Sequence, residues 1–378
     1  MPLDLTTREF VTPWFDVLHS GKARSLVTSC HLNKNQLILA DASGNVWSVD
    51  SVTGKKQWAV KCKYGLKFGF HLIDGQLLAF HEKGLALISP DNGNIETLLT
   101  LRNVHSPVLI NRRFYLQDSA QWWISKGNLL EIDPNTLEVK TLYQESTKRC
   151  MGNIFNIEIA EWTVDRILFF GDGHLRSYSV SSGTISKVLD EKYQNLAGLV
   201  TVGEHVFFIA DFDWERNRSL REHPHFQNVL HFDSAKQINI VDDEDQFLGS
   251  VNYSGSVQYR KEGDSIATFA GMVFYVRGKH FQKIGRLVAN DRYPRMPRTA
   301  QTAQFGEYIY IFFETSYGEH AEEIGFVLST VDVTNQYTRQ EHYVSGKLGR
   351  NFGSDVVHVF GEHLVVCGDG HYHLLHLK

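Results

Sequence analysis

The stretch Asn35–Lys61, NQLILADASGNVWSVDSVTGKKQWAVK, decides the fold that we predict for this chain. It contains three short apolar segments separated by two turns, and Gly44 and Gly54 lie in those turns. Glycine adopts the positive φ angles of tight hairpin turns at little cost. The stretch therefore predicts three antiparallel strands joined by two hairpins.

Similar strand-turn-strand segments recur along the chain, which predicts a repeat fold. Eight β-rich units fit into the 378 residues, with a period of roughly 47 residues. Units of this kind indicate an all-β fold, a single β-propeller of four-stranded blades. Eight blades are favoured, and seven are the alternative because residues 246–264 are poorly phased. The units begin near residues 35, 75, 112, 165, 204, 271, 307 and 361.

The two ends of the chain predict how the propeller closes. The last unit lacks an outer strand, and residues 1–20 precede the first complete unit while containing apolar side chains such as Phe15 and Val17. We expect residues 1–20 to supply a closing strand that pairs with the C-terminal blade, because closure removes exposed sheet edges. Residues 1–378 then form one domain.

Composition excludes several classes of protein. Hydrophobic residues make up 42% of the chain, and the net charge is −5, which argues against disorder and against nucleic-acid binding. No run of about 18 apolar residues predicts a membrane span, and the N-terminus has no signal-peptide pattern. The 4 cysteines show no CxxC spacing. We therefore expect free thiols and a soluble cytoplasmic protein.

The segment Trp47–Trp58, WSVDSVTGKKQW, resembles the repeat of pyrroloquinoline-quinone-type (quinoprotein-type) β-propellers. In that repeat the second turn reads Ala-Leu-Asp-x-x-Thr-Gly-x-x-x-Trp, and the matching residues here include Asp50, Thr53, Gly54 and Trp58. We expect Asp50 to accept hydrogen bonds from turn amides and Trp58 to pack on the neighbouring blade. Other units keep the pattern only in part; for example, Asp133 and Thr136 occupy the Asp and Thr places.

The resemblance implies a non-catalytic member of that repeat family. The catalytic members are quinone-dependent dehydrogenases, and no residue set in this chain matches their calcium and quinone ligands or their adjacent Cys-Cys pair. The non-catalytic members are scaffolds for protein assembly. We therefore expect no cofactor.

Long insertions point to one face of the propeller. They fall at residues 118–127, 145–156, 211–228, 290–300 and 314–323, between second and third strands or between blades, and these two kinds of connection open on the same face. Function on loops held by a rigid scaffold predicts a partner-binding face there. Trp and Arg are enriched at interface hot spots. The candidate partner-binding residues are Trp122, Trp123, Trp214, Arg216, Arg218, Arg221, His223, His225, Arg295, Arg298, Glu319, Glu322 and Glu323.

The histidines of the chain suggest an alternative interpretation, a metal-dependent enzyme. His371 and His373 lie two residues apart on an expected strand, and His174 or His358 would supply a third metal ligand from elsewhere. The interpretation as ordinary structural or surface histidines competes with this one, so we assign no metal and no catalytic residue. A metal-dependent lyase or hydrolase would use histidines in the central channel on a carbohydrate or another small ligand.

The preferred interpretation is a non-catalytic protein-binding propeller. It would act as a scaffold, an adaptor or an inhibitor/immunity-type module through its insertion-bearing face. We expect another protein as the partner, with neither nucleic acid nor membrane, and a small-molecule ligand in the central channel remains an option.

Overall fold

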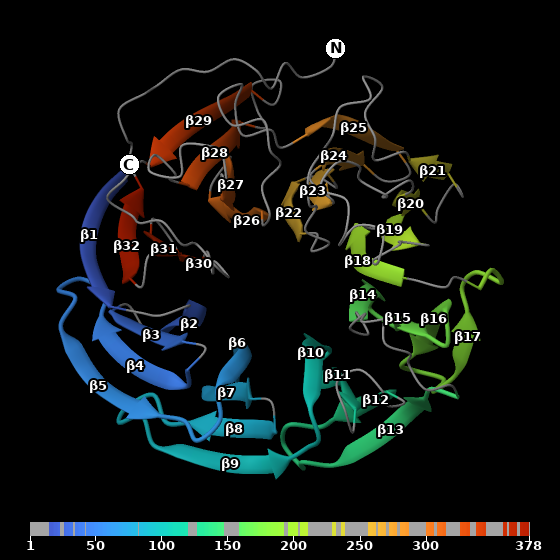
Figure 1. Ribbon diagram of the computed structural model, residues 1–378, viewed down its shortest axis with the longest axis horizontal. Helices are drawn as coiled ribbons and strands as arrows, with labels where there is room; N and C mark the ends of the chain where they lie inside the picture. Colours follow the sequence, from blue (N-terminus) through green and yellow to red (C-terminus); the bar gives the residue numbers. More distant parts are fainter. Residues whose placement is uncertain are drawn as a thin grey trace, which may run out of the picture.

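The structure, a computed structural model, describes residues 15–22, 26–32, 35–41, 43–81, 83–119, 127–146, 159–192, 196–202 and 205–210, and beyond residue 228 only strands. Within these residues it contains eight antiparallel sheets of four strands each (Figure 1). The predicted all-β architecture of four-stranded sheets is confirmed.

Seven sheets take four consecutive strands, and one sheet is shared by both ends of the chain. The first four are β2 (Leu26–Leu32), β3 (Gln36–Asp41), β4 (Asn45–Asp50), β5 (Lys56–Lys61); β6 (Leu66–Ile73), β7 (Gln76–His81), β8 (Gly84–Ile88), β9 (Ile95–Thr100); β10 (Val104–Ile110), β11 (Arg113–Ser119), β12 (Gly127–Ile132), β13 (Val139–Gln144); and β14 (Ile159–Thr163), β15 (Arg166–Gly171), β16 (His174–Ser179), β17 (Ile185–Lys187). The next three are β18 (Leu196–Val202), β19 (His205–Ala210), β20 (Val229–His231), β21 (Lys236–Ile238); β22 (Ser256–Lys261), β23 (Asp264–Phe269), β24 (Met272–Arg277), β25 (His280–Arg286); and β26 (Ala300–Phe305), β27 (Tyr308–Glu314), β28 (Phe326–Asp332), β29 (Thr338–Val344). The shared sheet, here called the terminal sheet, contains β30 (His358–Phe360), β31 (His363–Gly368), β32 (His371–Leu377) and β1 (Phe15–Lys22).

The sheets radiate from the centre of the molecule (Figure 1). The strand nearest the centre is β30 in the terminal sheet and the first of the four consecutive strands in every other sheet. These inner strands contact one another in cyclic order, β2, β6, β10, β14, β18, β22, β26, β30 and back to β2. In the terminal sheet, β1 is the outermost strand and pairs antiparallel with β32, with Phe15 opposite Leu377 and Lys22 opposite His371. The first described strand and the last strand of the chain are therefore neighbours.

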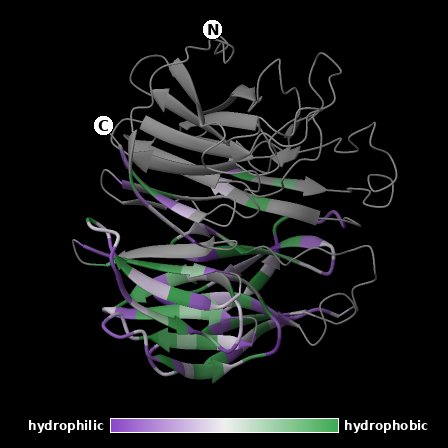
Figure 2. Ribbon diagram, turned by 60° about the vertical axis from the view of Figure 1, so that its left-hand side comes forward, coloured by the Kyte–Doolittle hydropathy of each residue, from purple (hydrophilic) through white to green (hydrophobic). Residues whose placement is uncertain are grey.

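The sheets β2–β5, β6–β9, β10–β13 and β14–β17 pack on both faces, because each lies between two others. Leu37 and Leu39 of β3 pack toward the terminal sheet with Leu374, whereas Ile38 and Ala40 pack toward the sheet β6–β9. Successive side chains of a strand point to opposite faces, so a strand with two covered faces needs a continuous apolar run. Hydrophobic residues accordingly follow the strands of the described sheets, and hydrophilic residues gather at the turns (Figure 2).

The turn between the third and fourth strands has one conformation in four successive sheets. In the first of them, Asp50 Oδ1 accepts hydrogen bonds from the Thr53 amide at 2.6 Å and from the Val52 amide at 3.1 Å, and the Gly54 amide donates to the Asp50 carbonyl at 2.8 Å. The turn amides, that of Thr53 first, lower the pKa of Asp50. The expected role of Asp50 as a turn acceptor is confirmed.

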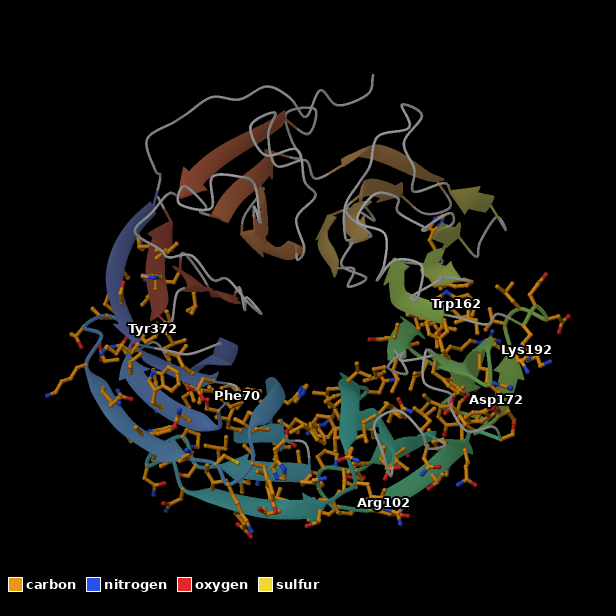
Figure 3. The ribbon with its side chains drawn as sticks, viewed as in Figure 1. Phe70, Arg102, Trp162, Asp172, Lys192 and Tyr372 are labelled. Carbon is orange, nitrogen blue, oxygen red and sulfur yellow. The ribbon has the colours of Figure 1, made fainter. Side chains whose placement is uncertain are left out.

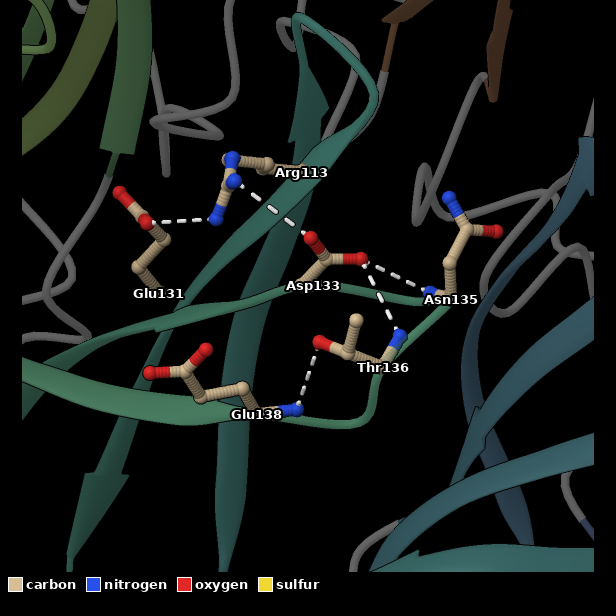
Figure 4. Close-up of polar contacts among 6 residues, drawn as sticks. All are labelled: Arg113, Glu131, Asp133, Asn135, Thr136 and Glu138. Atoms are coloured by element: carbon tan, nitrogen blue, oxygen red, sulfur yellow. Dashed lines mark hydrogen bonds and ion pairs between the residues drawn. The ribbon is translucent and has the colours of Figure 1, made fainter.

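The residue that ends this hydrogen-bonded turn has a positive φ in each of the four sheets. The angle is 69° at Gly54, 75° at Gly93, 59° at Leu137 and 68° at Gly183. Figure 4 shows the turn that leads to Leu137, in which Asp133 accepts hydrogen bonds from the amides of Asn135 and Thr136. Leu137 is an exception to the glycine that the sequence pattern predicts, and its side chain packs against the cluster between sheets β6–β9 and β10–β13.

Trp58 joins its sheet to the next one. Its indole Nε1 donates a hydrogen bond to the Pro90 carbonyl at 2.7 Å, and Gln36 Nε2 donates to the same oxygen at 2.7 Å. A Cβ atom placed on Gly93 would lie 2.5 Å from the indole, so the glycine lets the turn β8–β9 approach the tryptophan face. The expected packing of Trp58 on the neighbouring blade is confirmed.

We predict that Gly93→Ala destabilises the protein more than Gly183→Ala does. Both substitutions place an alanine at positive φ, which costs about 1–2 kcal/mol. A Cβ on Gly183 meets nothing within 4 Å, whereas a Cβ on Gly93 must displace the Trp58 indole. Overpacking of this kind costs about 1–3 kcal/mol more. Urea denaturation of the two variants measures the difference, and equal losses would contradict the docking role of Trp58.

His71 is a partly buried imidazole between two sheets. Its ring centroid lies 5.0 Å from that of Phe114 and 6.1 Å from that of Phe80, both in edge-on geometry. Its Nε2 atom is buried and has no hydrogen-bond partner among the residues that the structure describes. Burial lowers the pKa of His71, because the charged imidazolium loses its hydration there.

This environment predicts a stability that falls with acidification. The unfolded chain takes up a proton at His71 as the pH falls through about 6.5, whereas the folded chain does so only at lower pH. Lowering the pH below that value therefore favours unfolding, by up to about 1.4 kcal/mol per pH unit. Denaturant titrations at pH 7.5 and pH 5.5 should show a smaller loss of stability in His71→Leu than in the wild type. An identical loss in both would contradict the prediction.

Candidate interaction face

The strand order places two kinds of connection on one face of the ring of sheets. In an antiparallel four-stranded sheet, the turn from the second to the third strand and the link from the fourth strand to the next sheet leave from the same end. We call this end the long-connection face. The turns from first to second and from third to fourth strand form the opposite face.

Connection lengths differ sharply between the two faces. On the opposite face, the longest connections between the described strands are residues 89–94 and 133–138. The long-connection face carries residues 120–126, 145–158, 188–195, 211–228, 239–255, 287–299, 315–325 and 345–357. The segments 188–195, 239–255 and 345–357 were not among the insertions expected from the sequence. All eight long connections begin after β11, so this face is elaborated over part of the ring only.

The thirteen candidate partner-binding residues belong to four of these connections and lie outside the described residues. They are Trp122 and Trp123 in 120–126, then Trp214, Arg216, Arg218, Arg221, His223 and His225 in 211–228, then Arg295 and Arg298 in 287–299, and Glu319, Glu322 and Glu323 in 315–325. Their assignment to a binding surface stays a prediction.

Side chains tie together the described, short connections of the long-connection face. Tyr64, in the link β5–β6, stacks on the imidazole of His81 with ring centroids 5.1 Å apart, and the Lys63 ammonium lies 5.4 Å from the tyrosine ring. Lys83 Nζ donates a hydrogen bond to Asn103 Oδ1 at 2.8 Å. The turn β7–β8 is thereby joined to the links on both sides of it.

A second group of side chains fixes the point where the connection 145–158 begins. The Tyr143 hydroxyl donates a hydrogen bond to Asp172 Oδ2 at 2.5 Å, and the Ser146 amide donates to the same carboxylate at 3.0 Å. The Arg176 guanidinium lies 4.9 Å from the Tyr143 ring and donates to the Gly171 carbonyl. Burial and the bond to Asp172 raise the pKa of Tyr143, which keeps the phenol protonated.

Asp172 is held in the geometry that this contact needs. It forms the two-residue hairpin turn between β15 and β16 together with Gly173, with φ of 52° and 79° respectively (labelled in Figure 3). Two positive φ angles define the type I′ turn for which Asp-Gly is a preferred sequence. The Gly171-Asp172-Gly173 sequence is thus of a type that favours a hairpin, and the structure has that hairpin here.

The opposite face is held by ion pairs close to its turns. Arg113 contacts Glu131 at 2.9 Å and Asp133 at 3.4 Å, which links the start of β11 to the turn β12–β13 (Figure 4). Arg112 forms an ion pair with Asp74 of the preceding sheet. These contacts satisfy the charged groups within the chain itself.

The candidate metal ligands are distributed over two sheets. His371 and His373 lie in β32 and His358 in β30 of the terminal sheet, whereas His174 begins β16 of another sheet. His373 Nδ1 lies 2.6 Å from Ser20 Oγ, and His174 Nδ1 lies 2.9 Å from the Glu191 carbonyl oxygen. No three His, Cys, Asp or Glu side chains of the described part form a group able to hold a metal ion.

Two further properties of the described residues bear on function. No helix in them is long and apolar enough to span a bilayer. Cys62 is a buried free thiol, and the side chains of Cys30, Cys150 and Cys367 lie outside the described set.

Comparison with known proteins settles the fold. No protein-family model matches the chain, and no curated protein matches its sequence. Among solved structures, it is similar to the computationally designed protein Ika8 (TM-score 0.59, 11% identity, 95% of this chain and 98% of that chain) and to BamB from Moraxella catarrhalis (TM-score 0.53, 12% identity, 96% and 98%). It is also similar to the C-terminal WD40 domain of Sif2 (TM-score 0.59, 10% identity, 97% and 99%). The chain is a β-propeller. At these identities the likeness establishes the architecture alone.

Sequence reasoning missed the contacts that cross between blades of the propeller. Tyr64, His81 and Tyr143 have no distinctive sequence context, and each meets a partner that another connection supplies. Only the Asp172-Gly173 turn had a recognisable signal. A partner across a blade boundary depends on how two blades pack, which a repeat pattern does not contain.

We predict that Tyr143→Phe destabilises the protein by about 1.5–3 kcal/mol, the usual contribution of a hydrogen bond to a charged group. Asp172→Asn is the matched control, because asparagine tolerates the positive φ and keeps a carbonyl acceptor for the phenol. Chemical denaturation should rank Tyr143→Phe below Asp172→Asn, and hydrogen exchange should show faster opening at the Ser146 amide. Wild-type stability in Tyr143→Phe would contradict the assigned contact.

Proposed function

We propose that this propeller is a non-catalytic protein-binding module that acts through its long-connection face. The observation that carries the proposal is the difference in connection length between the two faces. Surface loops on a rigid scaffold are the usual place of recognition, because they vary without disturbing the core. Turns of minimal length on the opposite face leave little material for a binding site there.

The composition of the long connections supports a protein partner. Trp122, Trp123 and Trp214 are large apolar side chains in connections, and Arg216, Arg218 and Arg221 follow the last of them closely. Trp and Arg dominate interface hot spots because they bury large areas and form several contacts each. The net charge of −5 weighs against a nucleic-acid partner.

The sequence of the turn between β4 and β5 supports a more specific family assignment. The segment Trp47–Trp58 resembles the pyrroloquinoline-quinone-type repeat, and we place the chain among non-catalytic propellers with this repeat, without a cofactor. Such a module would serve as a scaffold, an adaptor or an inhibitor/immunity-type protein in the cytoplasm.

A pull-down with paired variants tests the proposal. The protein is immobilised, incubated with extract of its native source, and its partners are identified by mass spectrometry. We expect Trp214→Ala combined with Arg218→Ala to lose the partner that the wild type retains. The control carries Val52→Ser and Val164→Ser, two exposed apolar residues of the opposite face, and should retain it. Loss of the partner in the control alone would place the binding surface on the opposite face and contradict the proposal.

A further inference from the structure

A hollow of about 600 Å³ lies between the terminal sheet and the sheet β2–β5. Its walls come from β1 on one side and from β5 on the other. They are Ser20, Gly21 and Lys22 of β1, and Lys56, Ala59, Val60 and Lys61 of β5. Both strands are the outermost of their sheets. The hollow is therefore a groove at the outer edge of the propeller, where β1 and β5 run past each other.

The groove exists because β1 lacks the side chains that fill the corresponding space at the next blade. There, Trp58 and Val60 of β5 pack against the sheet β6–β9. In the terminal sheet, His19 takes the place of Trp58, since it meets the Gly54 turn as Trp58 meets the Gly93 turn. The residue two positions further along is Val60 in β5 and Gly21 in β1. Gly21 contributes no side chain to the seam, and the Tyr372 ring lies where its Cβ would be.

The floor of the groove is aromatic and fixed. A Cβ on Gly21 would lie 2.4 Å from the Tyr372 ring, so the glycine gives this ring its place (Tyr372 is labelled in Figure 3). Tyr372 packs on Trp47 with ring centroids 6.0 Å apart, and the indole forms a side-chain hydrogen bond with it. Both residues are buried. The packed rings of Tyr372 and Trp47 therefore keep the floor of the groove in place.

Lysine side chains line both ends of the groove. Lys22, Lys56 and Lys61 line it and are exposed. Asp41 is the acidic side chain of the lining, and it already accepts hydrogen bonds from the Ser43 and Asn45 amides and from the Asn45 side chain. Three lysines against one aspartate leave the lining of the groove with a net positive charge.

The lysines are separated along the strands instead of converging on one point. Lys56 begins β5, near the opposite face, and Lys61 ends it, beside Lys22 at the end of β1. At about 3.3 Å per residue, the backbone positions of Lys56 and Lys61 are about 17 Å apart. A single phosphate would reach one end only, whereas an extended chain would reach both.

We propose that this groove, the seam groove, binds an extended acidic peptide segment of a partner protein. Carboxylates of the peptide pair with Lys22, Lys56 and Lys61, and its backbone lies along β1 and β5. Neither strand has a partner on its outer side among the described sheets, so backbone donors and acceptors face the occupant. This surface is separate from the long-connection face and does not depend on it.

Fluorescence anisotropy with a fluorescein-labelled, alternating Glu-Ser octapeptide tests the proposal, with the Gln-Ser octapeptide as the uncharged probe. We expect the acidic peptide to bind and the uncharged one to bind much more weakly. Lys22→Glu combined with Lys61→Glu should weaken the acidic peptide by about tenfold or more, because two attractive charges become repulsive. Inorganic pyrophosphate should compete poorly; full competition at equal concentration would assign the site to a small anion and overturn the proposal.

Two further variants separate the groove from general charge. Lys140→Glu with Lys187→Glu makes the same change in net charge at exposed positions of other outer strands, and it should leave the affinity within about twofold of the wild type. Ala59→Trp fills the groove from an exposed position of β5 without removing a lysine, and it should abolish binding. Equal weakening by both lysine pairs, or unchanged binding by Ala59→Trp, would overturn the proposal. Trp214→Ala with Arg218→Ala should bind the peptide normally, which separates a failure here from a failure of the long-connection face.

Discussion

The structure depends on the packing of the sheets β2–β5, β6–β9, β10–β13 and β14–β17 against a neighbouring sheet on each of their two faces. Ile38 and Leu39 are adjacent in β3 and pack in different clusters, one toward each neighbouring sheet. A four-stranded sheet with two apolar faces has no stable isolated form in water, because each face needs a partner that removes it from solvent. A ring of such sheets satisfies this requirement without leaving a terminal face. The contact of β2 with β30 is part of the same arrangement.

Covering both faces also explains why the turns between third and fourth strands are so similar. Two of these turns approach the outer strand of the preceding sheet closely: the Gly54 turn approaches His19 and the Gly93 turn approaches Trp58. The Asp50 carboxylate satisfies the turn amides internally, so the turn needs no water-filled space at the contact. The opposite face therefore tolerates little insertion, and elaboration is confined to connections that do not dock between sheets.

The predictable part of the fold is the part encoded locally. The hairpins of Asn35–Lys61, the acceptor role of Asp50 and the docking of Trp58 follow from residue types at fixed spacing, and the structure has each of them. Leu137 departs from the pattern. It has the positive φ that the turn rule assigns to glycine, and its side chain packs in a cluster between two sheets, which a local turn rule does not contain. The histidine pair of β32 illustrates the same limit, since the contact of His373 with Ser20 arises only when the two ends of the chain share a sheet.

The seam groove follows from this shared sheet. In the sheet β2–β5, the outer strand β5 carries Trp58 and Val60, which pack against the next blade. The terminal sheet takes its outer strand from the beginning of the chain, where no repeat dictates the residues. His19 and Gly21 occupy positions that elsewhere carry larger or more apolar side chains, and a hollow lined by three lysines remains between two packed sheets. A recognition site at this place needs no insertion, because the junction itself supplies both the space and the charge.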